Sequence, residues 1–180
     1  KQEVLNKILE QHKLWVTSDK SEGERANLSG AYLARANLMG ANLSGAYANL
    51  SGAYLANAYL TGAYLTGADL SGANLMSASL RNACLTRANL MNASLRNASL
   101  RDANLSGANL KNANLKGADL SGANLTDVYL RNANLSGANL MNARLTRANL
   151  PGADLRDADL TGANLKDTDL TRAKIDHNIR

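Results

Sequence analysis

The chain has 180 residues but only one cysteine, one proline, two histidines and no phenylalanine. A single cysteine, Cys84, cannot close a disulfide within the chain, so nothing here points to an oxidising compartment. His12 and His177 lie near opposite ends, which argues against a histidine pair that binds a metal or activates a nucleophile. The net charge is +5 and the pI is near 9.5, so the chain is moderately basic.

Signatures of catalysis are also missing from the sequence. Glycine recurs at fixed intervals and does not form a phosphate-binding loop before a helix. Asp154, Asp159 and Asp169 all occupy the same outward position of a regular pattern. This favours ordinary surface carboxylates over a catalytic acid–base pair. We therefore expect no enzyme, no cofactor and no small-molecule substrate.

What the sequence has in abundance is a five-residue repeat centred on leucine. The centres are Leu28, Leu33, Leu38 and Leu43, then every fifth residue from Leu50 to Leu170, and finally Ile175. Alanine lies two residues before every centre except where Val128 and Thr168 replace it. A helix turns about 100° per residue and a strand alternates every second residue, so a period of five fits neither. A chain that turns a corner every five residues would point each Leu and Ala inward and close a coil after four phrases.

A phrase such as Ala133-Asn134-Leu135-Ser136-Gly137 resembles the pentapeptide repeat proteins, and the resemblance covers about residues 26–177. It implies an all-β solenoid, namely a right-handed quadrilateral β-helix of about seven and a half coils with a short N-terminal capping α-helix. The regularity is typical of a cyanobacterial-type or consensus-like member, and it also fits a consensus-designed chain without a biological partner. Right-handedness is what parallel crossover connections favour independently.

Corner chemistry supports this fold. Pro151-Gly152 follows a centre, and Pro then Gly suits the middle of a type II turn. Asn tolerates the same positive φ, as expected at Asn92 and Asn112. One side of the coil instead carries Arg and Asp at this corner and should contain fewer type II turns: its corners include Arg87, Asp127, Arg147 and Asp167. Val128 and Thr168, larger than Ala, should widen the coil slightly.

The chain divides into an N-terminal capping helix (1–16), a linker (17–25) and the β-helix (26–180). Val4, Leu5, Ile8 and Leu9 form an apolar stripe at helical spacing that can cover the first coil; a membrane-surface or partner helix is the alternative. Two extra residues between Leu43 and Leu50, most simply Ala46-Tyr47, indicate a corner loop. No stretch resembles a signal peptide or a membrane span, so we expect a cytoplasmic protein, although a first residue Lys leaves room for a removed leader.

Two surface features are candidates for binding a partner. Basic residues gather in the middle coils and should stack in pairs twenty residues apart: Arg81 with Arg101, Arg96 with Lys116, and Lys111 with Arg131. Three tyrosines precede successive centres and should ring three sides of one coil, and exposed aromatics are favoured at interfaces: Tyr54, Tyr59 and Tyr64.

These features favour a non-enzymatic structural scaffold that binds an unknown protein partner, as a monomer or as a dimer through an open C-terminal coil. The family resemblance implies an alternative, a DNA-mimicking topoisomerase modulator, but the basic middle disfavours mimicry of DNA. The same basic band could contact nucleic acid directly, although it lacks interleaved aromatics. A column from Ser44 and Thr66 to Thr146 also resembles an ice-binding hydroxyl ladder, but no second ladder lies beside it.

Overall fold

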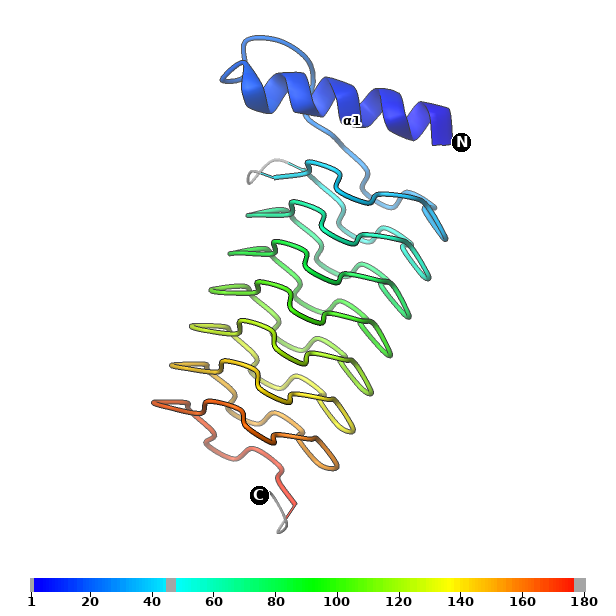
Figure 1. The fold of residues 1–180 in the computed structure, drawn as a ribbon. Coiled ribbons are helices and arrows are strands. Elements are labelled where there is room, and N and C mark those ends of the chain that lie inside the picture. The colour runs from blue at the N-terminus through cyan, green and yellow to red at the C-terminus, as the bar shows by residue number, and fades with distance from the viewer. Residues whose placement is uncertain (1, 45–47, 177–180) are drawn as a thin grey trace.

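The computed structural model describes residues 2–44 and 48–176. Within these ranges there is one helix, α1 (Gln2–Thr17), which lies across one end of a stack of coils, and the last described coil lies at the other end (Figure 1). In these described ranges the coils are joined by isolated parallel bridges and contain no longer strands. Each phrase has only one bridged residue between two corners. The chain is therefore a solenoid built from short sides.

The bridges set the register between coils. Four of them join each coil to the next, and their partners are twenty residues apart, as in Asn49↔Asp69 and Tyr64↔Cys84. The first step differs, because Asn27 pairs with Asn49, twenty-two residues away. The two additional residues expected between Leu43 and Leu50 are thus accommodated without loss of register, whereas Ala46 and Tyr47 themselves lie outside the described residues.

Every backbone N–H of a typical phrase has a partner, as residues 109–113 illustrate. The N–H groups of Asn109, Leu110 and Asn112 donate to carbonyls of neighbouring coils at 2.9, 2.7 and 2.9 Å. Ala113 N–H closes the turn on the carbonyl of Leu110 at 3.0 Å, and Lys111 N–H donates to the side-chain Oδ1 of Asn109 at 3.1 Å. Because buried backbone groups must be paired, this scheme explains why Asn or Asp is common before the centre.

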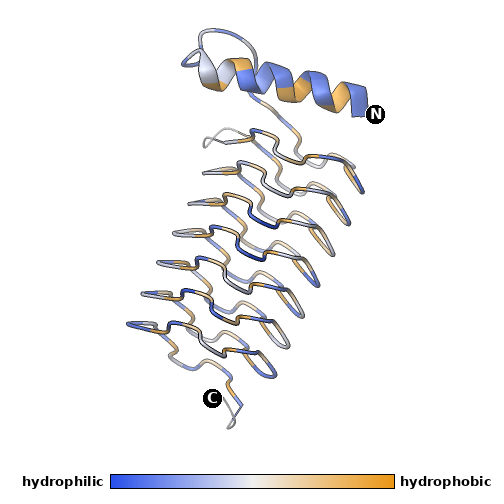
Figure 2. Cartoon of the chain, in the orientation of Figure 1, coloured by the Kyte–Doolittle hydropathy of each residue, from blue (hydrophilic) through white to orange (hydrophobic). Residues whose placement is uncertain are grey.

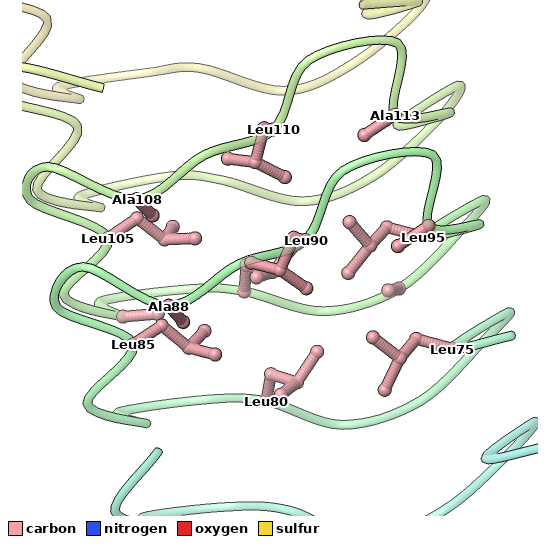
Figure 3. Close-up of a cluster of buried hydrophobic side chains, with 14 of the residues drawn as sticks. Leu75, Leu80, Leu85, Ala88, Leu90, Leu95, Leu105, Ala108, Leu110 and Ala113 are labelled. Atoms are coloured by element: carbon pink, nitrogen blue, oxygen red, sulfur yellow. The ribbon is translucent and has the colours of Figure 1, made fainter. Parts of the chain in front are cut away.

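Leucine and alanine fill the interior of the coils. Centres from Leu50 to Leu155 and the residues two positions before them are almost completely buried, and Figure 3 shows Leu85 and Leu90 lying below Leu105 and Leu110. Hydropathy alternates along each coil accordingly (Figure 2). Each buried leucine contributes roughly 1.5–3 kcal/mol, so columns of leucine are the main source of stability.

The corners correct one expectation from the sequence. Residues with positive φ occur at the same position of successive phrases, so the side expected to have fewer type II turns has them too: φ is 55° at Arg87, 57° at Asp127, 56° at Arg147 and 58° at Asp167. Each of these turns keeps its closing hydrogen bond, for example Ala88 N–H to Leu85 O at 3.0 Å. The hydrogen bonds of the stack therefore override the residue preference at the corner.

The larger side chains at two alanine positions lengthen the turns that precede them. The closing hydrogen bond is 3.3 Å from Val128 N–H to Leu125 O and 3.2 Å from Thr168 N–H to Leu165 O, against 3.0 Å for Ala93 N–H to Leu90 O. The effect is limited to the turns, because hydrogen bonds between coils keep ordinary lengths there, for example Asn149 N–H to Val128 O at 2.8 Å. Thr168 also donates its hydroxyl to Leu145 O at 2.8 Å, which satisfies its polar group inside the coil.

Helix α1 packs one face on the first coil. Leu5 and His12 are buried, and Ile8 and Leu9 pack beside Leu5 against the core. This spacing of three and four residues places all four on one side of a helix. Val4, grouped with this stripe from the sequence, is instead 63% exposed. His12 completes the buried face, and its Nδ1 accepts a hydrogen bond from Ala26 N–H at 3.2 Å.

The segment after α1 folds back against the helix. Glu24 N–H donates to Gln11 O at 3.2 Å, and Gly23 has a φ of 75° where a Cβ would overlap that same carbonyl. Only glycine fits this close approach. The expected linker (17–25) is therefore a defined connection that delivers the chain to Ala26 and the first coil.

Candidate binding surface

The residue directly after each centre is the natural place for a binding side chain. The residue before the centre is held down, because its side-chain oxygen accepts the N–H two residues later: Asn114 Oδ1 accepts from Lys116 N–H at 3.1 Å, and Asn134 Oδ1 from Ser136 N–H at 3.0 Å. At this position the Arg and Lys side chains of the middle coils are exposed, whereas Ser136 is partly buried and donates its hydroxyl back to Asn134 at 2.8 Å. The type of side chain at that position therefore sets the chemistry of the surface.

Six basic residues of the middle coils, which we call the basic belt, occupy this position and are all exposed: Arg81, Arg96, Arg101, Lys111, Lys116 and Arg131. The backbone places them in pairs on neighbouring coils. Asn82 N–H donates to Arg101 O at 3.0 Å, Asn97 N–H to Lys116 O at 3.0 Å, and Asn112 N–H to Arg131 O at 2.9 Å. The structure thus brings Arg81 beside Arg101, and the other two pairs likewise, on three different sides of the stack.

The three tyrosines of the second coil lie apart from the basic belt. Tyr54, Tyr59 and Tyr64 are exposed on three successive sides of the coil nearest the first one. Tyr32 of the first coil stacks on Tyr54, with ring centroids 4.9 Å apart and planes 5° from parallel. This stacking covers part of Tyr54, whereas Tyr59 is 54% and Tyr64 56% exposed.

A further exposed tyrosine, Tyr129, was not singled out in the sequence and lies within the basic belt. It forms bridges with Asn109 and Asn149, so an aromatic ring interrupts a column of asparagine and aspartate. The signal that could have found it is the phrase Val128-Tyr129, where both residues before a centre depart from the repeat. Around this ring lies an open groove of about 520 Å³, which we call the Tyr129 groove. Its lining residues are Gly107, Asn109, Lys111, Tyr129, Arg131 and Asn149.

The charge pattern reverses in the last coils, where the carboxylates are tied to neighbours. Arg156 donates two hydrogen bonds to Asp154, at 2.9 and 2.6 Å, and lowers the pKa of that carboxyl to about 2. Hydrogen bonds from Thr161 and Thr171 also lower the pKa values of Asp159 and Asp169. A general acid at neutral pH needs the opposite shift, so these groups are arranged to stay ionised.

An ion pair also joins two of the strained corners. Arg147 Nε and Nη2 each donate to a carboxylate oxygen of Asp127 at 2.7 Å, one coil away, which lowers the pKa of Asp127. Both side chains are about half exposed, so the pair contributes little to stability.

Cys84 and the hydroxyl column lie on the remaining side. The Cys84 sulfur lies 3.2 Å from Thr66 Oγ1 and 3.6 Å from Thr86 Oγ1. Burial raises the pKa of this thiol, but hydrogen bonds from Thr66 and Thr86 outweigh burial and lower it overall. The hydroxyls of Ser44 and Thr126 donate to Asn42 and Asn124 at 2.6 and 2.8 Å, so they are already engaged within the protein.

Metal clusters and membrane spans are both absent from residues 2–44 and 48–176. These ranges contain no group of three or more His, Cys, Asp or Glu side chains that could hold a metal ion. Their one helix is neither long nor apolar enough to cross a membrane. His177 falls outside the described residues.

Comparison with known proteins identifies the repeat. The family model for pentapeptide repeats matches eight copies, in overlapping stretches from residue 24 to residue 175, and describes a repeat, not a catalytic domain. Among solved structures, the fluoroquinolone resistance protein QnrB1 superimposes with a TM-score of 0.61 at 22% identity, over 78% of this chain and 77% of that one. Together these matches show a right-handed β-helix solenoid.

A second solved relative is more similar in sequence. HetL of the cyanobacterium Nostoc sp. strain PCC 7120, a pentapeptide repeat protein involved in heterocyst differentiation regulation, is 32% identical over 89% of this chain and 91% of its own, with a TM-score of 0.35. No curated protein is significantly similar in sequence.

Proposed function

Because the chain belongs to the pentapeptide repeat family, we propose that it is a rigid, non-catalytic scaffold that binds an acidic protein partner through the basic belt. The coil is quadrilateral, with about seven and a half turns. The observation that carries the proposal is the placement of six exposed cations at one repeat position on three neighbouring sides. Within each pair of the basic belt, two positive charges lie one coil apart and repel each other. An acidic partner would relieve this repulsion.

The rigidity of the backbone supports recognition of a folded partner. Most backbone N–H groups of the middle coils are bonded to carbonyls at 2.7–3.1 Å, so the basic side chains start from a fixed backbone. Fixed positions reduce the entropy that is lost when a complex forms. The surface is therefore suited to charge-complementary docking without a conformational change.

Charge reversal tests this proposal. We expect Arg96→Glu with Lys116→Glu to abolish capture of an acidic protein from the source organism, because both side chains are exposed on one side of the basic belt. The control, Arg172→Glu with Lys174→Glu, changes the net charge equally among the aspartates of the last coils. The captured protein, once purified, must bind the intact chain directly. Equal loss of binding in both double variants would contradict a role for the belt.

Nucleic acid is the competing partner for a basic surface. The basic belt runs around the stack of coils, so a DNA duplex could contact only part of it, through about three or four phosphates. Binding through phosphates weakens steeply as the salt concentration rises. We expect no sequence-dependent complex in a mobility-shift titration at about 150 mM salt. Sub-micromolar, sequence-dependent binding there would replace the protein-scaffold proposal with one of nucleic-acid recognition.

DNA mimicry and ice binding have weaker support than the scaffold. Mimicry of DNA needs a negative surface, whereas the net charge here is +5. Ice binding needs free hydroxyls in register, and those of Ser44 and Thr126 are hydrogen-bonded within the chain.

Whether the scaffold acts as a monomer or as a dimer through its C-terminal coil is tested by light scattering. A dimer would cover Ile175, which is 38% exposed.

A further inference from the structure

The Tyr129 groove lies where the repeat fails twice in succession on one side. Along this side, the side-chain oxygen before each centre usually accepts the N–H two residues later: Asn89 accepts from Met91 at 3.2 Å, and Asn109 from Lys111 at 3.1 Å. Tyr129 has no such oxygen, and Pro151, two residues after Asn149, has no N–H. Both interruptions adjoin the groove and leave polar groups uncommitted there.

The uncommitted groups are complementary to an anion. Within the described residues, the backbone N–H of Arg131 and the side chain of Asn149 have no hydrogen-bond partner. The ammonium of Lys111 and the guanidinium of Arg131 lie on the same groove and form no ion pair among these residues. No acidic side chain lines the groove, so a carboxylate there would meet two cations and a backbone donor.

The groove also offers an aromatic face. Tyr129 is 56% exposed, and Gly107 at the neighbouring corner has no side chain to cover the groove. Aromatic rings pair with other rings and with extended apolar groups at protein interfaces. A volume of about 520 Å³ is enough for a few side chains, and its openness to solvent suits a peptide segment on the surface more than an enclosed small molecule.

We propose that the Tyr129 groove binds an acidic segment of a protein partner, with carboxylates on Lys111 and Arg131 and an aromatic side chain on the ring of Tyr129. This inference rests on the proposed scaffold function and locates the contact within the basic belt. Asn149 then hydrogen-bonds the peptide backbone, because Pro151 leaves its amide oxygen available. The proline that breaks the repeat is thereby part of the binding surface.

Fluorescence anisotropy in about 150 mM salt tests the groove. The probe is a fluorescein-labelled peptide in which glutamates flank one tryptophan on both sides, compared with peptides that carry lysine for glutamate or alanine for tryptophan. We expect the first peptide to bind at least tenfold more tightly than either comparison peptide. Equal binding of all three peptides would overturn the proposal.

Variants that restore the repeat give a test without risk to folding. Tyr129→Asn returns the residue found in the same column at Asn109 and Asn149, and should weaken peptide binding at least tenfold. Pro151→Ser returns an N–H for Asn149 and should weaken it about threefold. The matched control is Tyr64→Asn, because Tyr64 is also 56% exposed but lies on another side. An equal effect of Tyr129→Asn and Tyr64→Asn would overturn the assignment.

The outcomes separate this inference from the scaffold proposal. Suppose that Tyr129→Asn binds the peptide normally while charge reversal at Arg96 and Lys116 abolishes partner binding. The proposal for the Tyr129 groove then fails, and the scaffold proposal is supported. If neither change affects any binding, both proposals fail. If a single-stranded oligonucleotide binds more tightly than the acidic peptide and Tyr129→Asn abolishes that binding, the groove recognises nucleic acid instead.

Discussion

Arginine and aspartate stand at corners where the backbone conformation suits glycine. Arg87 has a φ of 55° and Asp102 one of 57°, a region that costs most residues about 1–2 kcal/mol. The same corners carry hydrogen bonds to the adjacent coil, such as Arg87 N–H to Ser106 O at 2.9 Å. Twenty-residue stacking imposes the turn, and the residue accommodates it. Single-residue preferences therefore predict these corners poorly.

Replacing a strained arginine should stabilise the protein. We expect Arg87→Asn to raise the free energy of unfolding by about 0.5–1 kcal/mol, because Asn adopts positive φ more readily than Arg. Arg81→Asn is the control, since Arg81 precedes its corner and lacks a positive φ. Urea denaturation of both variants measures the difference. An unchanged midpoint for Arg87→Asn would mean that the corner carries no strain.

Histidine 12 makes the docking of α1 sensitive to acid. Burial lowers its pKa below the ordinary 6.5, a nearby Ser44 carbonyl partly opposes this, and the charge of Arg25 lowers it further. The neutral ring stacks on Trp15 and accepts from Ala26 N–H. A lowered pKa means that the unfolded chain binds the proton more readily. The contribution of His12 to stability is thus complete above pH 6.5 and is lost as the pH falls towards its folded pKa.

Thermal melts between about pH 7.5 and 5 test this sensitivity. As the pH falls, the melting temperature of the native protein should decrease more than that of His12→Asn, which keeps an acceptor for Ala26 N–H but does not titrate. Carboxylates affect both proteins alike, so the difference between the two curves isolates the histidine. Parallel curves would show that α1 docking does not depend on the protonation of His12.

At the scale of elements, α1 is the only part of the described chain that is not built from the repeat, apart from the connection that follows it. Its buried face could be predicted from the spacing of Leu5, Ile8 and Leu9. The role of His12 could not, because a histidine at the fourth position of that face is recognised as core only when the coil beneath it is known. The same holds for Gly23, whose need for glycine arises from contact with Gln11 O.

Charge placed on the buried face of α1 should uncover the first coil. We expect Leu5→Asp to lower the melting temperature and to promote association, because Leu5 is 4% exposed against the core. Val4→Asp adds the same charge to the same helix at a position that is 63% exposed, and should leave both properties unchanged. Deletion of residues 1–16 should act like Leu5→Asp. A deletion variant that stayed monodisperse with an unchanged melting temperature would show that α1 is not a cap.

At the scale of the whole molecule, the fold was predictable and the proposed binding surface only partly so. Leu and Ala at fixed intervals determine the coils, and twenty-residue pairing correctly placed Arg81 beside Arg101 and Lys111 beside Arg131. The Tyr129 groove depends on which hydrogen bonds are missing around one ring. That information appears only when the partners of Asn149 and Arg131 are known.

Periodicity predicts which deletions the molecule tolerates. Removal of residues 81–100 joins Leu80 to Arg101 and keeps every column, so the product should fold as a shorter β-helix with a similar far-ultraviolet circular dichroism spectrum per residue. Removal of the seven residues 81–87 brings Leu80 and Leu90 within three residues of each other and should prevent native stacking. Failure of the twenty-residue deletion to fold would show that the middle coils are not equivalent.

The step of twenty residues between bridged partners also has a genetic meaning. One coil corresponds to about sixty nucleotides at three per residue, so unequal recombination between two coils adds or removes a complete structural unit. An exchange of a single phrase, about fifteen nucleotides, keeps leucine and alanine inward but carries every later side chain a quarter-turn around the tower. Between Lys111 and Arg131, such a mutation would separate these two residues, which now share a side, while the reading frame and the core survive. Gene families of this kind can thus rearrange their surfaces by copy-number change alone.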